Sequence, residues 1–178
     1  PHATAMSVSP PSQGGFRWVF IMKHFSISEL TSSATALREG IDNRPSKCAY
    51  HLLHVLVDQL LDPIREAWGE PIVVSSGYRC KELNTLIGGV KNSHHMLGCA
   101  ADITAPLLSP QGGKKSSTMS EYLPLGGGRE GANRRLFKLI QQMQQSGQIR
   151  FTQLIWEGDG RWIHISYVPS DLRCQVIE

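Results

Sequence analysis

This chain of 178 residues lacks several features that mark other classes of protein. Its apolar runs fall well short of the roughly 18 residues that a membrane-spanning helix needs. The net charge is only +3, and no basic stripe of the kind found in nucleic-acid-binding domains is evident. We therefore expect no membrane span and no nucleic-acid partner. Because 40% of the residues are apolar, the chain can bury the core of one domain.

Cysteine is scarce, and its spacing is uninformative about metals. The four cysteines are Cys48, Cys80, Cys99 and Cys174, and no two of them form a C-x-x-C pair, which argues against a zinc ribbon. We expect four free, mostly buried thiols. One disulfide is the alternative if the protein works outside the cell.

Two segments have a composition unlike the rest. Residues 1–22 are rich in Pro, Ser and Gly, so we interpret them as a leader or appended segment ahead of a domain over 23–178. The apolar stretch 16–22 is too short for a signal peptide and lacks a cleavage-like ending. Residues 105–133 are rich in Gly, Ser and Lys and lack periodicity, which predicts a loop insertion.

Apolar periodicity predicts one long helix and three shorter ones. Leucines and Ile64 recur every four residues over 46–68. We expect Pro63 to kink this helix or to start a new turn, and Gly69 to end it. The shorter helices are predicted over 26–35, 81–87 and 133–145.

β-Branched and alternating runs predict the strands. They are a buried strand over 71–75, a second over 100–104, and a hairpin of 152–157 and 161–167 that turns at Gly158-Asp159-Gly160. Helices that precede and separate clusters of strands predict an α+β fold, with a small antiparallel sheet and helices packed on one side.

The last predicted strand presents a polar face. Because side chains alternate along a strand, Ile163 and Ile165 would face the core, while Trp162, His164 and Ser166 would line the opposite face. A lone histidine on a strand is more often simply exposed. His164 therefore becomes informative only if other ligands accompany it.

A second histidine comes with a carboxylate. His95 and Asp102 are seven positions apart, across Gly98 and other small residues that let the backbone turn. Zinc accepts histidine nitrogen and aspartate oxygen, and three protein ligands leave a fourth position for water at hydrolytic sites. Adjacent residues point in different directions, so we expect His94 not to reach the same ion.

An arginine follows the first predicted strand. Arg79 stands where a guanidinium could bind a substrate carboxylate with two hydrogen bonds. An ordinary surface arginine is an equally good interpretation of this position taken alone.

Together these residues match a known pattern. The runs are Ser76-Gly77-Tyr78-Arg79, Ser93-x-His95-x-x-Gly98-x-Ala100-x-Asp102 and Trp162-x-His164-x-Ser166. In this order they resemble the zinc D-alanyl-D-alanine carboxypeptidase family, which includes vancomycin-resistance peptidases and phage endolysins that cleave L-alanyl-D-glutamate bonds. The likeness extends over roughly 23–168 and implies a hedgehog-like zinc peptidase fold.

The resemblance implies roles for individual residues. His95, Asp102 and His164 match the family's zinc ligands. Arg79 matches an arginine that binds or polarises the substrate. Ser93 matches a residue close to the first ligand, and we predict that it contacts the substrate.

The resemblance also bears on the catalytic base, and Trp162 is a further predicted substrate contact. Many members have an acidic residue three positions before the last ligand, but here that residue is Arg161, which cannot act as a base. Other members carry a glutamate that Glu157 matches, so we predict Glu157 as the base. Asp159 is the alternative.

The function implied is zinc-dependent hydrolysis of peptide bonds in peptidoglycan stem peptides, of the carboxypeptidase or the endopeptidase type. A non-catalytic, zinc-containing cell-wall binding module is the alternative, and Arg161 favours it. We expect a monomer that acts on the cell wall. The lack of a recognisable signal peptide fits a phage or prophage protein released from the cytoplasm.

Overall fold

The computed structural model describes residues 22–106 and 128–178. The predicted leader, apart from Met22, and most of the predicted insertion at 105–133 lie outside the described residues. The predicted end of the insertion at residue 133 was wrong, because residues from Arg129 onward are helical.

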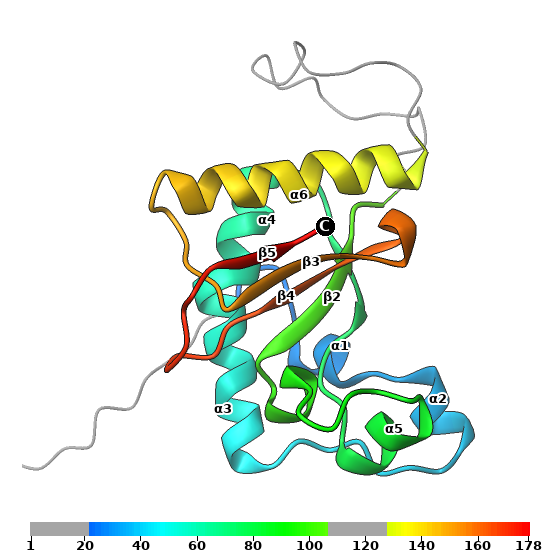
Figure 1. Cartoon of the computed structure of the whole chain (residues 1–178). Helices are drawn as coiled ribbons and strands as arrows, with labels where there is room; N and C mark the ends of the chain where they lie inside the picture. The colour runs from blue at the N-terminus through cyan, green and yellow to red at the C-terminus, as the bar shows by residue number, and fades with distance from the viewer. Residues whose placement is uncertain (1–21, 107–127) are drawn as a thin grey trace, which may run out of the picture.

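A five-stranded sheet is the centre of the fold, in the order β1-β2-β4-β3-β5 (Figure 1). Its strands are β1 (Val73–Ser76), β2 (Ala100–Thr104), β3 (Gln153–Glu157), β4 (Trp162–Ser166) and β5 (Gln175–Ile177). The pairs β1–β2, β2–β4 and β3–β4 are antiparallel, whereas β5 adds to β3 in parallel. This mostly antiparallel sheet, accompanied by helices, confirms the predicted α+β class.

The sheet departs from the predictions at both edges. β1 was expected to be buried, but it is an edge strand with Val73 46% exposed, and its pairing with β2 is irregular between Val74 and Ser76. The buried residue is Ile72, just before the strand. β5 was not predicted, because three exposed residues carry no alternation to detect.

The long helical segment consists of α3 (Lys47–Leu56), a π-helical turn (Val57–Leu61) and α4 (Asp62–Trp68). Pro63 stands in the first turn of α4, where its missing N–H is tolerated, and the wider turn precedes it. Gly69 ends α4 with φ 76°, as predicted.

The shorter helices are close to their predicted positions. They are α1 (Ile27–Thr31), α2 (Ala34–Arg38), α5 (Lys81–Leu86) and α6 (Arg129–Gln145). The single helix expected over 26–35 is in fact two, because Ser32 is extended and the Ser33 hydroxyl caps α2. The predicted strand positions and the hairpin turn are otherwise confirmed.

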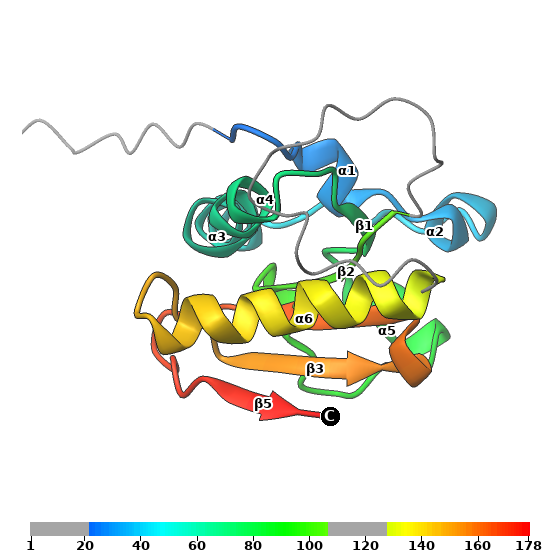
Figure 2. The same ribbon diagram turned by 90° about the horizontal axis from the view of Figure 1, so that it is seen from above.

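The core lies between the sheet and the long helices. Ile103, Ile163 and Ile165 are fully buried in one cluster with Ile64 of α4 and Phe137 of α6. The helices α3 and α4 pass behind the strands (Figure 1), and α6 runs along the direction of β3, with β5 beyond β3 at the edge of the sheet (Figure 2). Because strand residues alternate, Asp102 and His164 project from the face opposite this core.

All four cysteines are free, as expected. Only Cys99 is buried, so the prediction that most of them are buried was wrong. Burial raises the pKa of the Cys99 thiol to about 11, helped by the nearby Cys48.

Candidate metal centre

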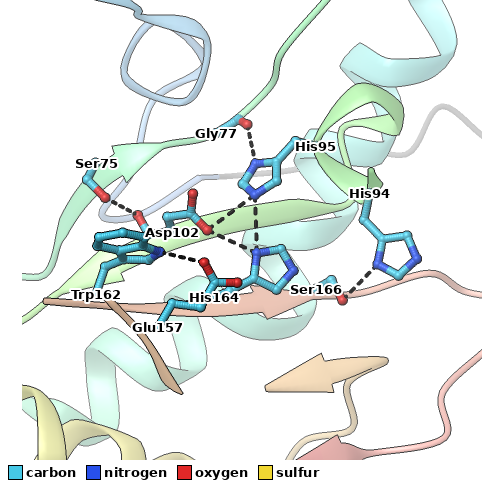
Figure 3. Close-up of polar contacts among 9 residues, drawn as sticks. All are labelled: Ser75, Gly77, His94, His95, Asp102, Glu157, Trp162, His164 and Ser166. Atoms are coloured by element: carbon cyan, nitrogen blue, oxygen red, sulfur yellow. Dashed lines mark hydrogen bonds and ion pairs between the residues drawn. The ribbon is translucent and has the colours of Figure 1, made fainter. Parts of the chain in front are cut away.

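His95, Asp102 and His164 come together, each offering one ligand atom within 4.8 Å of the other two (Figure 3). Asp102 on β2 and His164 on β4 are direct cross-strand partners. Asp102 Oδ1 lies 2.9 Å from His164 Nδ1 and 3.2 Å from His95 Nε2, and the two ring nitrogens are 3.2 Å apart. Residues 69 positions apart in the sequence thus share one small volume.

The spacing of these atoms fits a zinc ion. Tetrahedral ligands at about 2.0–2.1 Å from zinc lie about 3.4 Å from one another. The observed separations of 2.9–3.2 Å are only slightly shorter. Two imidazole nitrogens and one carboxylate oxygen also form a donor set that zinc prefers.

The tautomer of His95 is set by the backbone. Its Nδ1–H donates to the Gly77 carbonyl oxygen at 2.6 Å. In the neutral ring Nε2 then carries a lone pair, and this lone pair faces the Asp102 carboxylate at 3.2 Å. A cation between the two acceptors, either a metal ion or a proton on Nε2, satisfies both of them. A backbone carbonyl on the outer nitrogen is also the usual support of a metal-binding histidine.

A short 3-10 helix, His94–Leu97, positions the first ligand. It is closed by Gly98, whose φ of 76° favours glycine. A Cβ at Gly98 would also overlap the Ala49 carbonyl oxygen of α3. The glycine between His95 and Asp102 is therefore required by both backbone conformation and close packing.

The loop that carries Gly77 is equally restricted. A Cβ at Gly77 would overlap the Leu30 carbonyl, which accepts a hydrogen bond from the Tyr78 N–H at 2.7 Å. Asn43 holds the same loop, because its Nδ2 donates to the carbonyls of Thr31 and Tyr78. Its Oδ1 accepts from the Cys80 N–H at 2.7 Å. Sequence reasoning assigned no role to Gly77 or Asn43, since both act through contacts distant in the sequence.

The electrostatics favour a charged carboxylate at the centre. Burial raises the pKa of Asp102, but hydrogen bonds and charges from His164 and His95 lower it by more, and the net pKa lies well below the ordinary range. His95 is 1% exposed, and Asp102 and His164 are each 9% exposed, so water screens this group only weakly.

The negative charge of Asp102 also affects the pKa of Arg79. Burial lowers the pKa of Arg79, while the negative charges of Asp102 and Glu157 raise it, and the net pKa is lowered. A guanidinium nevertheless stays protonated near neutral pH. Its Nε is buried and has no hydrogen-bond partner within residues 22–106 and 128–178.

The remaining predicted residues are Glu157, Trp162, Asp159 and Ser93. Glu157 is the cross-strand partner of Trp162, and its Oε2 accepts a hydrogen bond from the Trp162 indole at 3.1 Å (Figure 3). Asp159 is exposed in the turn, with φ 55°. Ser93 is buried just ahead of the 3-10 helix. His94 points elsewhere, and its Nδ1 hydrogen-bonds the Ser166 hydroxyl at 3.1 Å.

Comparison with known families gives one match. Residues 23–124 fit the family model described as Peptidase M15. This range contains His95 and Asp102 and stops before His164. No curated protein matches the sequence significantly. Within the described ranges, no helix combines the length and the apolar character needed to cross a membrane.

Proposed function

Because this chain belongs to the Peptidase M15 family of zinc metallopeptidases, we propose that it hydrolyses peptide bonds in peptidoglycan stem peptides. We propose His95, Asp102 and His164 as the ligands of a single zinc ion. The observation that carries this proposal is the convergence of their ligand atoms to within 4.8 Å. His164 lies outside the range of the family match, so its position beside the other two is independent support.

The protein residues would bind and orient the substrate around the ion. When bound, zinc supplies Lewis acidity, which polarises a carbonyl and acidifies water. Arg79 has a positive charge and a buried Nε–H without a partner in the described part of the chain. We propose that Arg79 donates to the substrate carbonyl oxygen, where its positive charge would stabilise the negative charge that develops during attack.

Proton transfer is assigned to Glu157. It pairs across the strands with Trp162, so the two side chains share a face, and that face also carries His164. The indole hydrogen bond holds the carboxylate in place. As general base, Glu157 would take a proton from the attacking water and deliver it to the leaving amine. Asp159, the alternative, is exposed in the turn.

Substrate contacts, setting and assembly complete the proposal. Trp162 lies on the face of β4 that carries His164, and Ser93 directly precedes the short helix that carries His95; both are proposed to contact the stem peptide. We propose that the protein acts on the cell wall as a monomer, and that it is of phage or prophage origin and is released from the cytoplasm. Both the carboxypeptidase and the endopeptidase type are compatible with these residues.

A specific observation favours a second candidate, a zinc-containing wall-binding module without activity. Arg161 occupies the position at which many relatives carry an acidic residue. The two functions are separated by incubating the zinc-loaded protein with peptidoglycan and identifying the products by mass spectrometry. New amino groups at a stem-peptide bond support the peptidase, and their absence at full zinc loading favours the binding module.

A further inference from the structure

A cavity of about 540 Å³ lies beside the proposed metal centre, along the face of the sheet that carries Asp102 and His164. Thr104 lies two residues after Asp102 on β2, and Trp162 lies two residues before His164 on β4; both line this cavity. Residues two apart on a strand share a face and are separated by about 7 Å. The cavity wall therefore begins about 7 Å from the proposed zinc ligands, a distance that two residues of an extended peptide span.

Two arginines line this cavity. Arg129 is the first residue of α6, Arg161 immediately precedes β4, and both are exposed. Neither forms an ion pair within the described residues, and no acidic side chain of those residues lines the cavity. The described lining thus carries two positive charges and no negative one, which favours an anionic ligand, although the Glu130 side chain packs against Gly160 close by.

The Arg161 guanidinium is partly fixed before any ligand binds. Its Nε donates to the Gly158 carbonyl at 2.9 Å, and its central carbon lies 5.2 Å from the centroid of the Trp162 ring. The hydrogen bond leaves the two terminal NH₂ groups as donors. Paired donors of this kind match the two oxygens of a carboxylate.

We propose that Arg129 and Arg161 form a carboxylate subsite that binds a free carboxylate of the substrate peptide close to the scissile bond. This inference rests on the proposed peptidase function and narrows its substrate class to peptides that carry such a carboxylate. It also gives Arg161 a role: this residue replaces the acidic residue of many relatives and cannot act as a base, but it would select the substrate. In a stem peptide the carboxylate could belong to a D-glutamyl residue or to a C-terminal D-alanine.

Matched acid and amide probes test the subsite by binding alone. The zinc-loaded full chain is titrated by NMR with γ-D-glutamyl-L-lysine and with its α-amide, and separately with D-alanine and D-alaninamide. We expect one acid to bind about tenfold more tightly than its amide, a size consistent with a carboxylate held by two exposed arginines. The pair that shows the preference identifies the source of the carboxylate.

Variants connect the preference to the two arginines. Arg161→Gln and Arg129→Gln should each abolish most of it, while Arg38→Gln, at an exposed arginine of α2, should preserve it. A loss in both variants excludes an effect confined to the hydrogen bond between Arg161 and the Gly158 carbonyl. Equal binding of acid and amide by the unmodified chain, or a preference that persists in both variants, overturns the subsite. Failure of the peptidase proposal is seen separately, as a lack of new amino groups in the peptidoglycan digest.

Discussion

Asp102 and His164 face each other across two antiparallel strands, and a carboxylate oxygen of one lies 2.9 Å from a ring nitrogen of the other. The strand pairing sets this distance, because both residues belong to the regular ladder of the sheet. His95 reaches the same point from a short helix. The proposed centre is thus two residues on a rigid sheet and one residue on a tightly restrained turn.

The two neighbouring histidines should differ in their effect on zinc. His164→Ala removes a proposed ligand, so zinc content should fall from one equivalent to well below it under competition from a chelator. His94→Ala, at a histidine that instead contacts Ser166, should retain a full equivalent. Metal analysis of the dialysed proteins makes the comparison. Full zinc content in the His164 variant would remove it from the site.

Gly98 and Gly147 provide a matched pair of glycines, since both have φ 76°. Gly147→Ala meets nothing within 4 Å, so it should cost only the left-handed backbone term of about 1–2 kcal/mol. Gly98→Ala adds a collision with the Ala49 carbonyl. It should reduce the free energy of unfolding by more, measured by urea denaturation, and should also weaken zinc binding through His95. Equal losses in the two variants would show that the collision is relieved without cost.

Replacement of the proposed base should affect turnover without removing the metal. Glu157→Gln should lower kcat by about 10²–10⁴-fold while zinc content stays at one equivalent. Asp159→Asn should change kcat little, because that side chain is exposed in the turn. Hydrolysis of a defined stem peptide gives the rates. The reverse result, with Asp159→Asn inactive and Glu157→Gln active, would transfer the role to Asp159.

The cysteines should differ in their reaction with iodoacetamide. A pKa raised to about 11 leaves only about one Cys99 thiol in a thousand ionised at pH 8, and the thiolate is the reactive form. Cys48 is exposed and should be modified first. Because Cys99 titrates above this range, its rate should rise about tenfold per pH unit between pH 8 and 9.5. Peptide mapping by mass spectrometry follows each site, and equal rates at pH 8 would contradict this assignment.

Local patterns predicted much of the fold. The alternation around His164 correctly placed Ile163 and Ile165 in the core, and Gly69 correctly ended the long helix. These features depend on residues close in the sequence. The exposure of β1 depends on which strands become neighbours, and a pattern of β-branched residues carries no such information.

The residues that hold the metal centre in place could not be predicted from local sequence patterns either, because they act through contacts distant in the sequence. The Gly77 carbonyl contacts a histidine 18 positions away, and the Asn43 side chain bonds to Tyr78 and Cys80, 35 and 37 positions away. A glycine in the Ser76–Arg79 run was visible in the sequence. That its carbonyl, rather than its flexibility, orients a ring could be seen only in the structure.

The central claim is that one zinc ion is held jointly by three side chains, and anomalous diffraction from crystals of the zinc-loaded protein tests it most directly. The account predicts a single strong anomalous peak at zinc-ligand distance, about 2.0–2.2 Å, from His95 Nε2, Asp102 Oδ1 and His164 Nδ1. A peak elsewhere, or a zinc ion that leaves any of the three uncoordinated, would contradict it.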